Sequence, residues 1–165
     1  LIENFLLGYE DSKPFMRGPF LDYTAAEEHA SEAVKKFDVR TPGVDVLGQT
    51  LSGGNQQKLI VAREMQRDPK MLIASQPTRG LDVAATEFVH NQLVDLRSKG
   101  KAILLVSMEL SEILDLSDRI LVMYAGEVVG SFIGGEVTAE QLGLLMAGSK
   151  LQPKPADTFA LEEEG

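Results

Sequence analysis

Residues 51–58 read Leu-Ser-Gly-Gly-Asn-Gln-Gln-Lys, and residues 76–82 read Gln-Pro-Thr-Arg-Gly-Leu-Asp. In the first stretch, a serine followed by two glycines is typical of a turn that opens a helix, where the backbone N–H groups of the first helical turn have no partner within the helix. These N–H groups, the Ser52 hydroxyl and the positive end of the helix dipole converge on one point. The stretch therefore predicts a binding site for an anion such as a phosphate group.

Taken alone, Ser52, Gly53 and Gly54 also fit an ordinary N-cap and turn. Together, however, the two stretches resemble the ATP-binding cassette (ABC) ATPases, in which a signature sequence opens a helix and precedes the Walker B strand, a Pro-Thr turn and the Leu-Asp D-loop. The resemblance covers about residues 1–149. The details of both stretches, and GLLMAG at residues 143–148, are similar to the second cassette of simple-sugar and nucleoside importers, in the branch that works with basic-membrane-lipoprotein receptors.

The hydrophobic pattern predicts an α/β fold, because helical and strand patterns alternate along the chain. The runs at 71–74 and 102–106 are continuously apolar, which is typical of strands buried on both faces of a parallel sheet. Residues 1–23 indicate irregular structure after a short helix, and residues 38–50 indicate a loop. The other expected elements are helices at 24–37 with Thr24 as the candidate cap, at 52–68, at 82–100 and around 113–116, and strands at 119–123 and 127–133.

The resemblance implies a truncated ABC-type P-loop NTPase. It divides the chain into a helical subdomain with the signature motif at residues 1–68 and the C-terminal part of the parallel-sheet ATPase core at residues 69–149. Residues 150–165 contain two prolines and a Glu-Glu-Glu run, so we expect a disordered tail there.

The sequence contains no Gly-x-x-x-x-Gly-Lys-[Ser/Thr] phosphate loop, since Gly100 and Lys101 are followed by Ala102. By the resemblance, that loop and its strand would precede Leu1. We therefore expect the chain alone to bind nucleotide poorly. A parallel sheet without those strands exposes apolar faces and unpaired edges, which predicts self-association or rearranged packing.

The resemblance also shows where the nucleotide site of this half departs from the family pattern. ABC ATPases usually carry Asp-Glu before Pro-Thr, and a switch histidine after the next strand, whereas this chain has Ser75, Gln76 and Met108. Ser75 has no carboxylate for Mg²⁺, Gln76 cannot accept a proton as a glutamate does, and Met108 offers no donor. Each change alone also fits drift at a tolerant position, but together they predict a catalytically degenerate site.

The signature motif, in contrast, is intact. In ABC dimers each signature faces the ATP held by the other cassette, so the resemblance implies that Ser52, Gly53 and Gly54 contact the γ-phosphate of Mg-ATP bound mainly by a companion cassette. Asn55 would stand nearby, and Asp82 would lie at the interface. The implied partners are the companion cassette, transmembrane permease subunits and, indirectly, a receptor lipoprotein. The implied location is the cytoplasmic face of the cell membrane, reached through the permease.

Composition limits the alternatives. The formal net charge of -9, from 25 acidic and 16 basic residues, argues against a nucleic-acid-binding surface, which needs clustered lysine and arginine. The chain has no cysteine, which excludes disulfides and thiolate metal sites. Two other readings stay open: a soluble ABC ATPase of DNA repair or translation, which should show basic surface and intact carboxylates, and a non-enzymatic interaction module built on the same fold.

Overall fold

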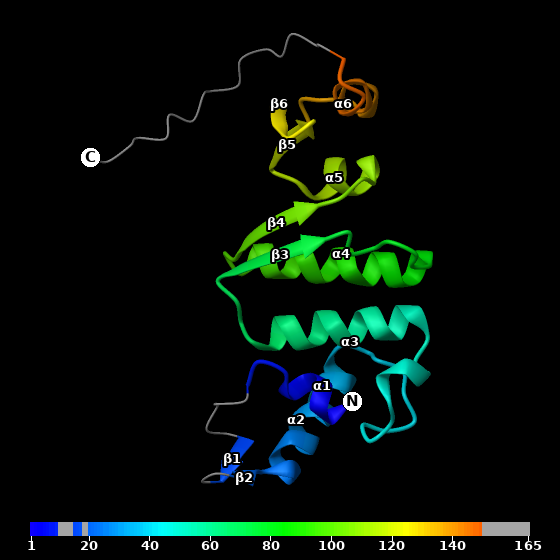
Figure 1. Cartoon of the computed structure of the whole chain (residues 1–165), viewed down its shortest axis with the longest axis vertical. Coiled ribbons are helices and arrows are strands. Elements are labelled where there is room, and N and C mark those ends of the chain that lie inside the picture. The colour runs from blue at the N-terminus through cyan, green and yellow to red at the C-terminus, as the bar shows by residue number, and fades with distance from the viewer. Residues whose placement is uncertain (10–14, 18–19, 150–165) are drawn as a thin grey trace, which may run out of the picture. The chain divides into compact units, whose positions relative to one another are not determined.

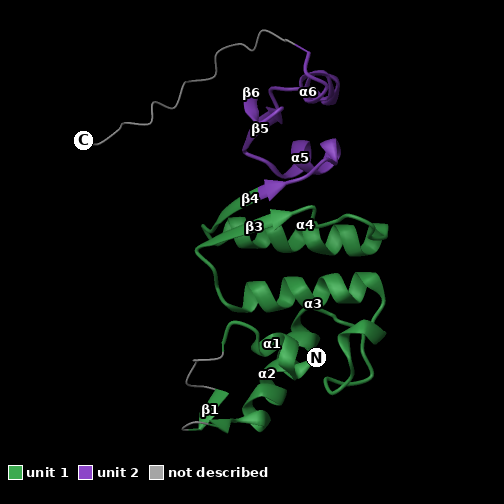
Figure 2. Cartoon of the chain, in the orientation of Figure 1, with its two compact units in different colours: residues 1–104 green, residues 105–165 purple. Residues whose placement is uncertain are grey.

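The computed structural model describes residues 1–9, 15–17 and 20–149 (Figure 1), so the expected disordered tail at 150–165 lies outside the described residues. The chain forms two compact units that divide after Leu104 (Figure 2). The elements are α1 (Ile2–Leu6), β1 (Met16–Arg17), β2 (Phe20–Leu21), α2 (Tyr23–Lys36), η2 (Gly48–Thr50), α3 (Gly53–Gln66), β3 (Met71–Ser75), α4 (Val83–Ser98), β4 (Ala102–Val106), α5 (Leu110–Leu116), β5 (Arg119–Tyr124), β6 (Glu127–Ile133) and α6 (Ala139–Met146). The alternation of helices and strands confirms the predicted α/β class. Among the described helices, none combines the length and the apolar character that crossing a bilayer requires.

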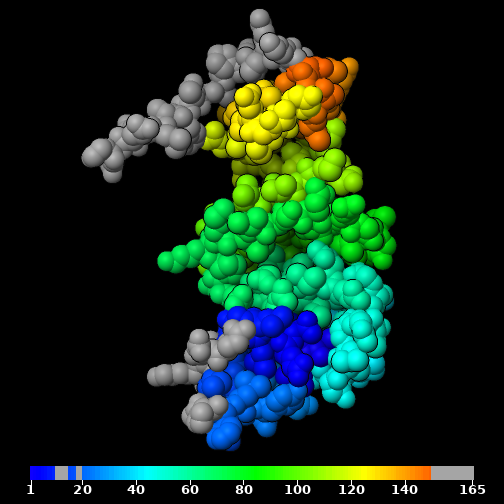
Figure 3. All heavy atoms as spheres, in the orientation of Figure 1, coloured from blue at the N-terminus to red at the C-terminus, as the bar shows by residue number. Residues whose placement is uncertain are grey.

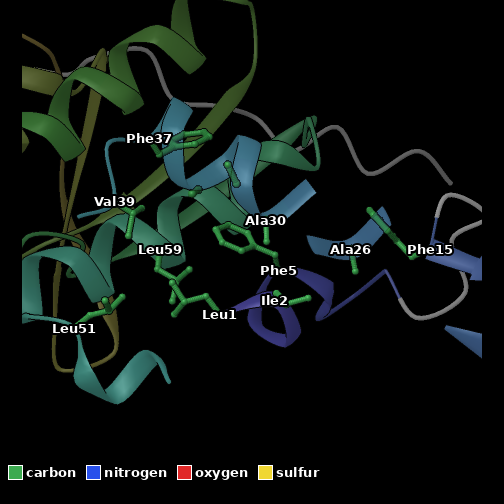
Figure 4. Packing of buried hydrophobic residues seen from close by; sticks show 12 residues of the cluster. Leu1, Ile2, Phe5, Phe15, Ala26, Ala30, Phe37, Val39, Leu51 and Leu59 are labelled. Atoms are coloured by element: carbon green, nitrogen blue, oxygen red, sulfur yellow. The ribbon is translucent and has the colours of Figure 1, made fainter. Parts of the chain in front are cut away.

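The core of the first unit lies between α1, α2 and α3 (Figure 4). Phe5 of α1 is fully buried, as are Ala26 and Ala30 of α2, which belong to the face that the sequence pattern predicts. The helix nevertheless begins earlier than predicted. Its N-cap is Asp22, whose carboxylate accepts a hydrogen bond from the backbone N–H of Ala25 at 3.3 Å, and not Thr24. An aspartate one turn ahead of the apolar face satisfies the free N–H groups as well as a threonine does.

The loop between α2 and α3 closes over the start of the chain. The backbone N–H of Ile2 donates to the carbonyl of Val44 at 3.2 Å, and Leu51, which ends the loop, is buried in the same core. In the space-filling view the dark blue atoms of α1 adjoin the cyan atoms of this loop (Figure 3). The predicted irregular segment at 1–23 also contains a short antiparallel pair, β1 with β2, which the sequence pattern missed.

β3 and β4 are neighbours in a two-stranded sheet, and both arrows point the same way in Figure 1, with α4 connecting them. The prediction that both strands are buried on two faces is wrong. Side chains alternate along each strand, and those of Met71, Ile73, Leu104 and Val106 are exposed by 46 to 65% of their surface. Packing within the described residues covers one face of these strands, which explains why their apolar runs do not translate into full burial.

In the second unit, β5 and β6 form an antiparallel hairpin around Ala125 and Gly126, as predicted. Both turn residues have positive φ, 48° and 86°, which is the geometry of the tight turns that match strand twist. α6 packs on β5 through Leu142 and Leu145, which are fully buried, and its N-cap Thr138 forms a capping box. These contacts give the second unit a core of its own.

We expect the isolated chain to self-associate through the exposed face of β3 and β4, because its apolar side chains gain from burial. Replacing Ile73 by threonine should weaken the association about tenfold, which corresponds to losing most of one buried isoleucine side chain. Sedimentation velocity at rising concentration measures this. Val83→Thr is the matched control, since Val83 is 85% exposed but lies on a helix outside the sheet. A monomer at every concentration would contradict the prediction.

Candidate functional site

The first unit brings the two sequence stretches together at the start of α3. Ser52 occupies the N-cap position, with φ −62° and ψ 156°, as predicted. Its hydroxyl, however, makes no capping hydrogen bond to the helix. Ser52 and Gly53 are exposed, and the first backbone N–H groups of an α-helix have no partner within it. The turn therefore leaves a hydroxyl and backbone donors accessible to an anion.

Asn55 contacts this turn from within the helix. Its Nδ2 donates to Ser52 Oγ at 3.0 Å, and its Oδ1 accepts a hydrogen bond from the backbone N–H of Arg40 at 2.8 Å. Arg40 lies in the loop after α2, so the amide of Asn55 connects that loop to the serine. The sequence singled out Asn55 only as a neighbour of the phosphate and gave no indication of these partners.

Gln57 and Lys58, further along the first turns of α3, attach the helix to other parts of the unit. Gln57 Nε2 donates to the carbonyl of Pro77 at 2.7 Å, which connects α3 to the turn after β3. Lys58 Nζ donates to the backbone carbonyl of Asp38 at 3.0 Å and to its carboxylate at 2.8 Å, and lies 4.7 Å from the ring centroid of Phe88 on α4. Sequence reasoning missed both roles, because the partners of these side chains are 20 residues away along the chain.

Asp82 lies beside the same turn. It is the N-cap of α4, as expected of a residue that opens a helix, and its Oδ1 accepts a hydrogen bond from the N–H of Ala85 at 2.8 Å. A Cβ atom built on Gly54 would lie 3.3 Å from the Cβ of Ala85 and 3.9 Å from Asp82 Oδ2. The first turns of α3 and α4 therefore approach closely, and a glycine at position 54 permits it.

The residues expected to mark a degenerate site follow or end the strands β3 and β4. Ser75 ends β3 and is exposed, and Gln76 follows it with φ 49°, a left-handed conformation that is unusual for a residue with a side chain. Met108 follows β4 in the second unit, with 72% of its surface exposed. These side chains bring neither a carboxylate nor an imidazole to their positions.

No protein-family model matches the chain. Individual proteins do. The chain is 47% identical over 149 residues to the nucleoside import ATP-binding protein NupA of Lactococcus lactis. This match covers 90% of this chain and 29% of the relative. It is 49% identical over 147 residues to the guanosine import ATP-binding protein NupO of Bacillus subtilis, and this match covers 89% of this chain and 29% of the relative. A bacterial ABC transporter cassette solved as a dimer superposes with a TM-score of 0.64 at 25% identity, over 80% of this chain and 55% of that one.

The chain belongs to the ABC family. The relatives that it matches are ATP-binding proteins of nucleoside and sugar import, which confirms the resemblance drawn from the two sequence stretches. The α/β fold is that of an ABC cassette, present in part. This partial cassette spans less than a third of the length of the curated relatives named above. A second structure of the solved dimeric cassette, bound to ADP and phosphate after hydrolysis, superposes with a TM-score of 0.65.

The ion pair of Lys58 with Asp38 makes the stability of the cassette depend on pH. The hydrogen bond from Lys58, and then its charge, lowers the pKa of Asp38 below the usual 3.8, and the charge of Arg40 adds to this. Because the folded state lowers this pKa, the ion pair stabilises the fold above pH 3.8 and its contribution disappears as the pH falls through the lowered value.

We therefore expect Asp38→Asn to lower the melting temperature slightly at pH 7, and the difference from the wild type to shrink as the pH falls below 3.8. Asparagine has the shape of aspartate and also tolerates the φ of 49° at this position. Thermal unfolding by circular dichroism, followed from pH 7 to pH 2, measures the difference. A gap that stayed constant over this range would mean that the ion pair does not form in solution.

Alanine scanning of the two glycines tests the close approach of α3 and α4. A Cβ at Gly53 meets nothing within 4 Å, whereas one at Gly54 meets Ala85 at 3.3 Å. We expect Gly54→Ala to unfold with about 1 kcal/mol less free energy than Gly53→Ala, because the tight contact has to relax. Chemical denaturation of both variants gives the difference. In the Ala85→Gly background, the extra cost of Gly54→Ala should disappear. Equal stabilities of Gly53→Ala and Gly54→Ala would refute the close contact.

Proposed function

We propose that this chain is part of the ATP-binding subunit of an ABC importer for a nucleoside or a sugar, and that its Ser52–Asn55 turn completes the ATP site of a companion cassette. The import proteins among its relatives support the transport role. The exposed turn itself is the observation that supports its role at the ATP site of a companion cassette. Its serine hydroxyl makes no capping hydrogen bond to the backbone N–H groups of the helix that it opens, although that is the usual role of a serine at an N-cap.

The residues of the turn fit a phosphate group. Ser52 would donate its hydroxyl hydrogen to a γ-phosphate oxygen, and the backbone N–H groups of Gly53 and Gly54 would donate beside it at the positive end of α3. ATP supplies the phosphoryl group that is transferred to water. Glycine at position 53 leaves the approach unobstructed, since no atom lies within 4 Å of where its side chain would start.

The residues of this chain's own site do not fit hydrolysis. A Mg²⁺ ion requires hard oxygen ligands, most often carboxylates, and an attacking water requires a group that can take its proton. Ser75 and Gln76 are neutral, and Met108 has a thioether in place of a hydrogen-bond donor. We infer that this site is degenerate and that hydrolysis takes place at the site where the companion cassette holds Mg-ATP.

This asymmetry gives the chain its place in the transporter. The solved bacterial cassette named above forms a dimer, and a dimer is what the proposed role of the signature turn requires. Closure of such a dimer around ATP, with Asp82 at the interface, would move the permease subunits that carry the cargo. Contact with the permease, and through it indirectly with a receptor lipoprotein, would keep the cassette at the cytoplasmic face of the membrane.

Two substitutions in the intact transporter test the proposal. Ser52→Arg removes the hydroxyl donor and fills the turn with a long side chain, so ATPase activity should fall at least about a hundredfold, which is typical for the loss of one donor to a developing charge. Gln76→Ala should leave the activity within about twofold, because no base is lost. Steady-state phosphate release with the purified transporter in lipid measures both. Retained activity in Ser52→Arg together with a large loss in Gln76→Ala would refute the proposal.

A further inference from the structure

We propose that Asn55 is a positioning residue whose amide turns the hydroxyl hydrogen of Ser52 outward, toward the phosphate. This inference rests on the proposed function and assigns Asn55 a role that differs from direct contact with ATP. It follows from the hydrogen bonds that join Arg40, Asn55 and Ser52 in the first unit.

The orientation of the Asn55 amide is fixed by its partner in the loop. A backbone N–H can only donate, so the atom of Asn55 that lies 2.8 Å from the N–H of Arg40 has to be the oxygen, Oδ1. The amide nitrogen, Nδ2, then faces Ser52 Oγ at 3.0 Å. This settles which end of the amide faces the serine, a choice that the shape of the side chain leaves open.

The loop that fixes the amide is itself held in place. Val39, the residue before Arg40, is buried in the core of the first unit, and its N–H donates to the carbonyl of Val34 at 2.9 Å. Asp38 receives two hydrogen bonds from Lys58, one helical turn along α3 from Asn55. The N–H of Arg40 is therefore a donor on a well-packed segment that is attached to the same helix.

The direction of the serine hydrogen follows from this arrangement. A hydroxyl has one hydrogen and two lone pairs, and Nδ2 of Asn55 can only donate, so it occupies a lone pair of Ser52 Oγ. The hydrogen cannot point at Asn55 and has to be directed elsewhere. Because the oxygen also makes no capping bond to α3, the backbone N–H groups of the first turn keep their freedom to donate to a ligand. Asn55 thus leaves both kinds of donor available for one anion.

The chemistry makes asparagine specific at this position. An aspartate of the same shape would still accept from the N–H of Arg40, but its second oxygen could only accept from Ser52 and would draw the hydroxyl hydrogen inward. A glutamine is longer by one methylene and would change both distances. A residue that merely attached the loop to the helix would need only the acceptor, which aspartate keeps.

A double-mutant cycle in the intact transporter tests the inference, with ATPase rate at saturating Mg-ATP and KM as readouts. Asn55→Ala should lower the rate about tenfold when Ser52 is present, because a hydroxyl in the wrong orientation loses much of one hydrogen bond to a charged group. In the Ser52→Ala background the same substitution should change the rate less than about twofold, since the group that it positions is gone. An equal fold-loss in both backgrounds would overturn the inference, because that is the behaviour of a residue that only holds the loop.

Two further variants keep the result interpretable. Asn55→Asp retains the shape of the side chain and the hydrogen bond to Arg40, so it can replace Asn55→Ala in the cycle if that variant unfolds. Its loss of rate should also be larger with Ser52 present than in the Ser52→Ala background, and equal losses would again overturn the inference. Gln57→Ala is the matched control, because it removes an amide hydrogen bond from the same helix, to Pro77, without touching Ser52. Its effect should be the same in both backgrounds.

The cycle also separates this inference from the proposed function. If Ser52→Ala alone leaves the ATPase rate unchanged, the signature turn does not act on ATP and the proposed function fails. If Ser52→Ala lowers the rate but the effect of Asn55→Ala simply multiplies with it, the proposed function stands and only the positioning role of Asn55 is overturned.

Discussion

The backbone of α3 lies close against the first turn of α4, and the absence of a side chain at residue 54 allows this close packing. A Cβ there would lie 3.3 Å from that of Ala85, so one of the two helices would have to shift by a few tenths of an ångström. The other contacts of α3 depend on this approach. Gln57 reaches the carbonyl of Pro77, and Lys58 reaches Phe88 on α4, because the helices are already close. The packing of α3 against α4 therefore fixes the geometry of the turn at residues 52–55.

Much of this arrangement was predictable from the sequence. The apolar stripe of α4 and the hairpin around Ala125 and Gly126 follow from periodicity and from turn chemistry. The same rules failed for β3 and β4, since a continuous apolar run does not say how many faces the surrounding chain covers. They also missed β1 and β2, whose strands of two residues are too short to show any period. The helix cap lies at Asp22 and not at Thr24; both residue types can cap a helix, so the sequence did not decide between them.

The residues of the candidate site also differ in whether the sequence could indicate their roles. Ser52, Gly53 and Gly54 could be singled out because their types and spacing carry the chemistry of an anion site, and Asp82 because of the resemblance to the ABC D-loop. The partners of Asn55 and Lys58 could not, because they lie 15 and 20 residues away and depend on how the loop after α2 returns to α3. Ser52 lies at the N-cap position, as predicted, but its hydroxyl makes no capping hydrogen bond. Its oxygen accepts a hydrogen bond from the amide of Asn55 instead, a partner that the sequence pattern did not indicate.

The left-handed backbone at Gln76 does not depend on the chemistry of its side chain. Its φ of 49° costs about 1 kcal/mol for a residue with a side chain, and the cost is the same for glutamine and for glutamate. The turn is closed by a hydrogen bond from the N–H of Arg79 to the carbonyl of Gln76, which uses no side-chain atom. The main chain at this position is therefore indifferent to whether a carboxylate or an amide extends from it. A change between the two would leave this turn as it is, so the proposed loss of hydrolysis at this position would require no rearrangement of the backbone.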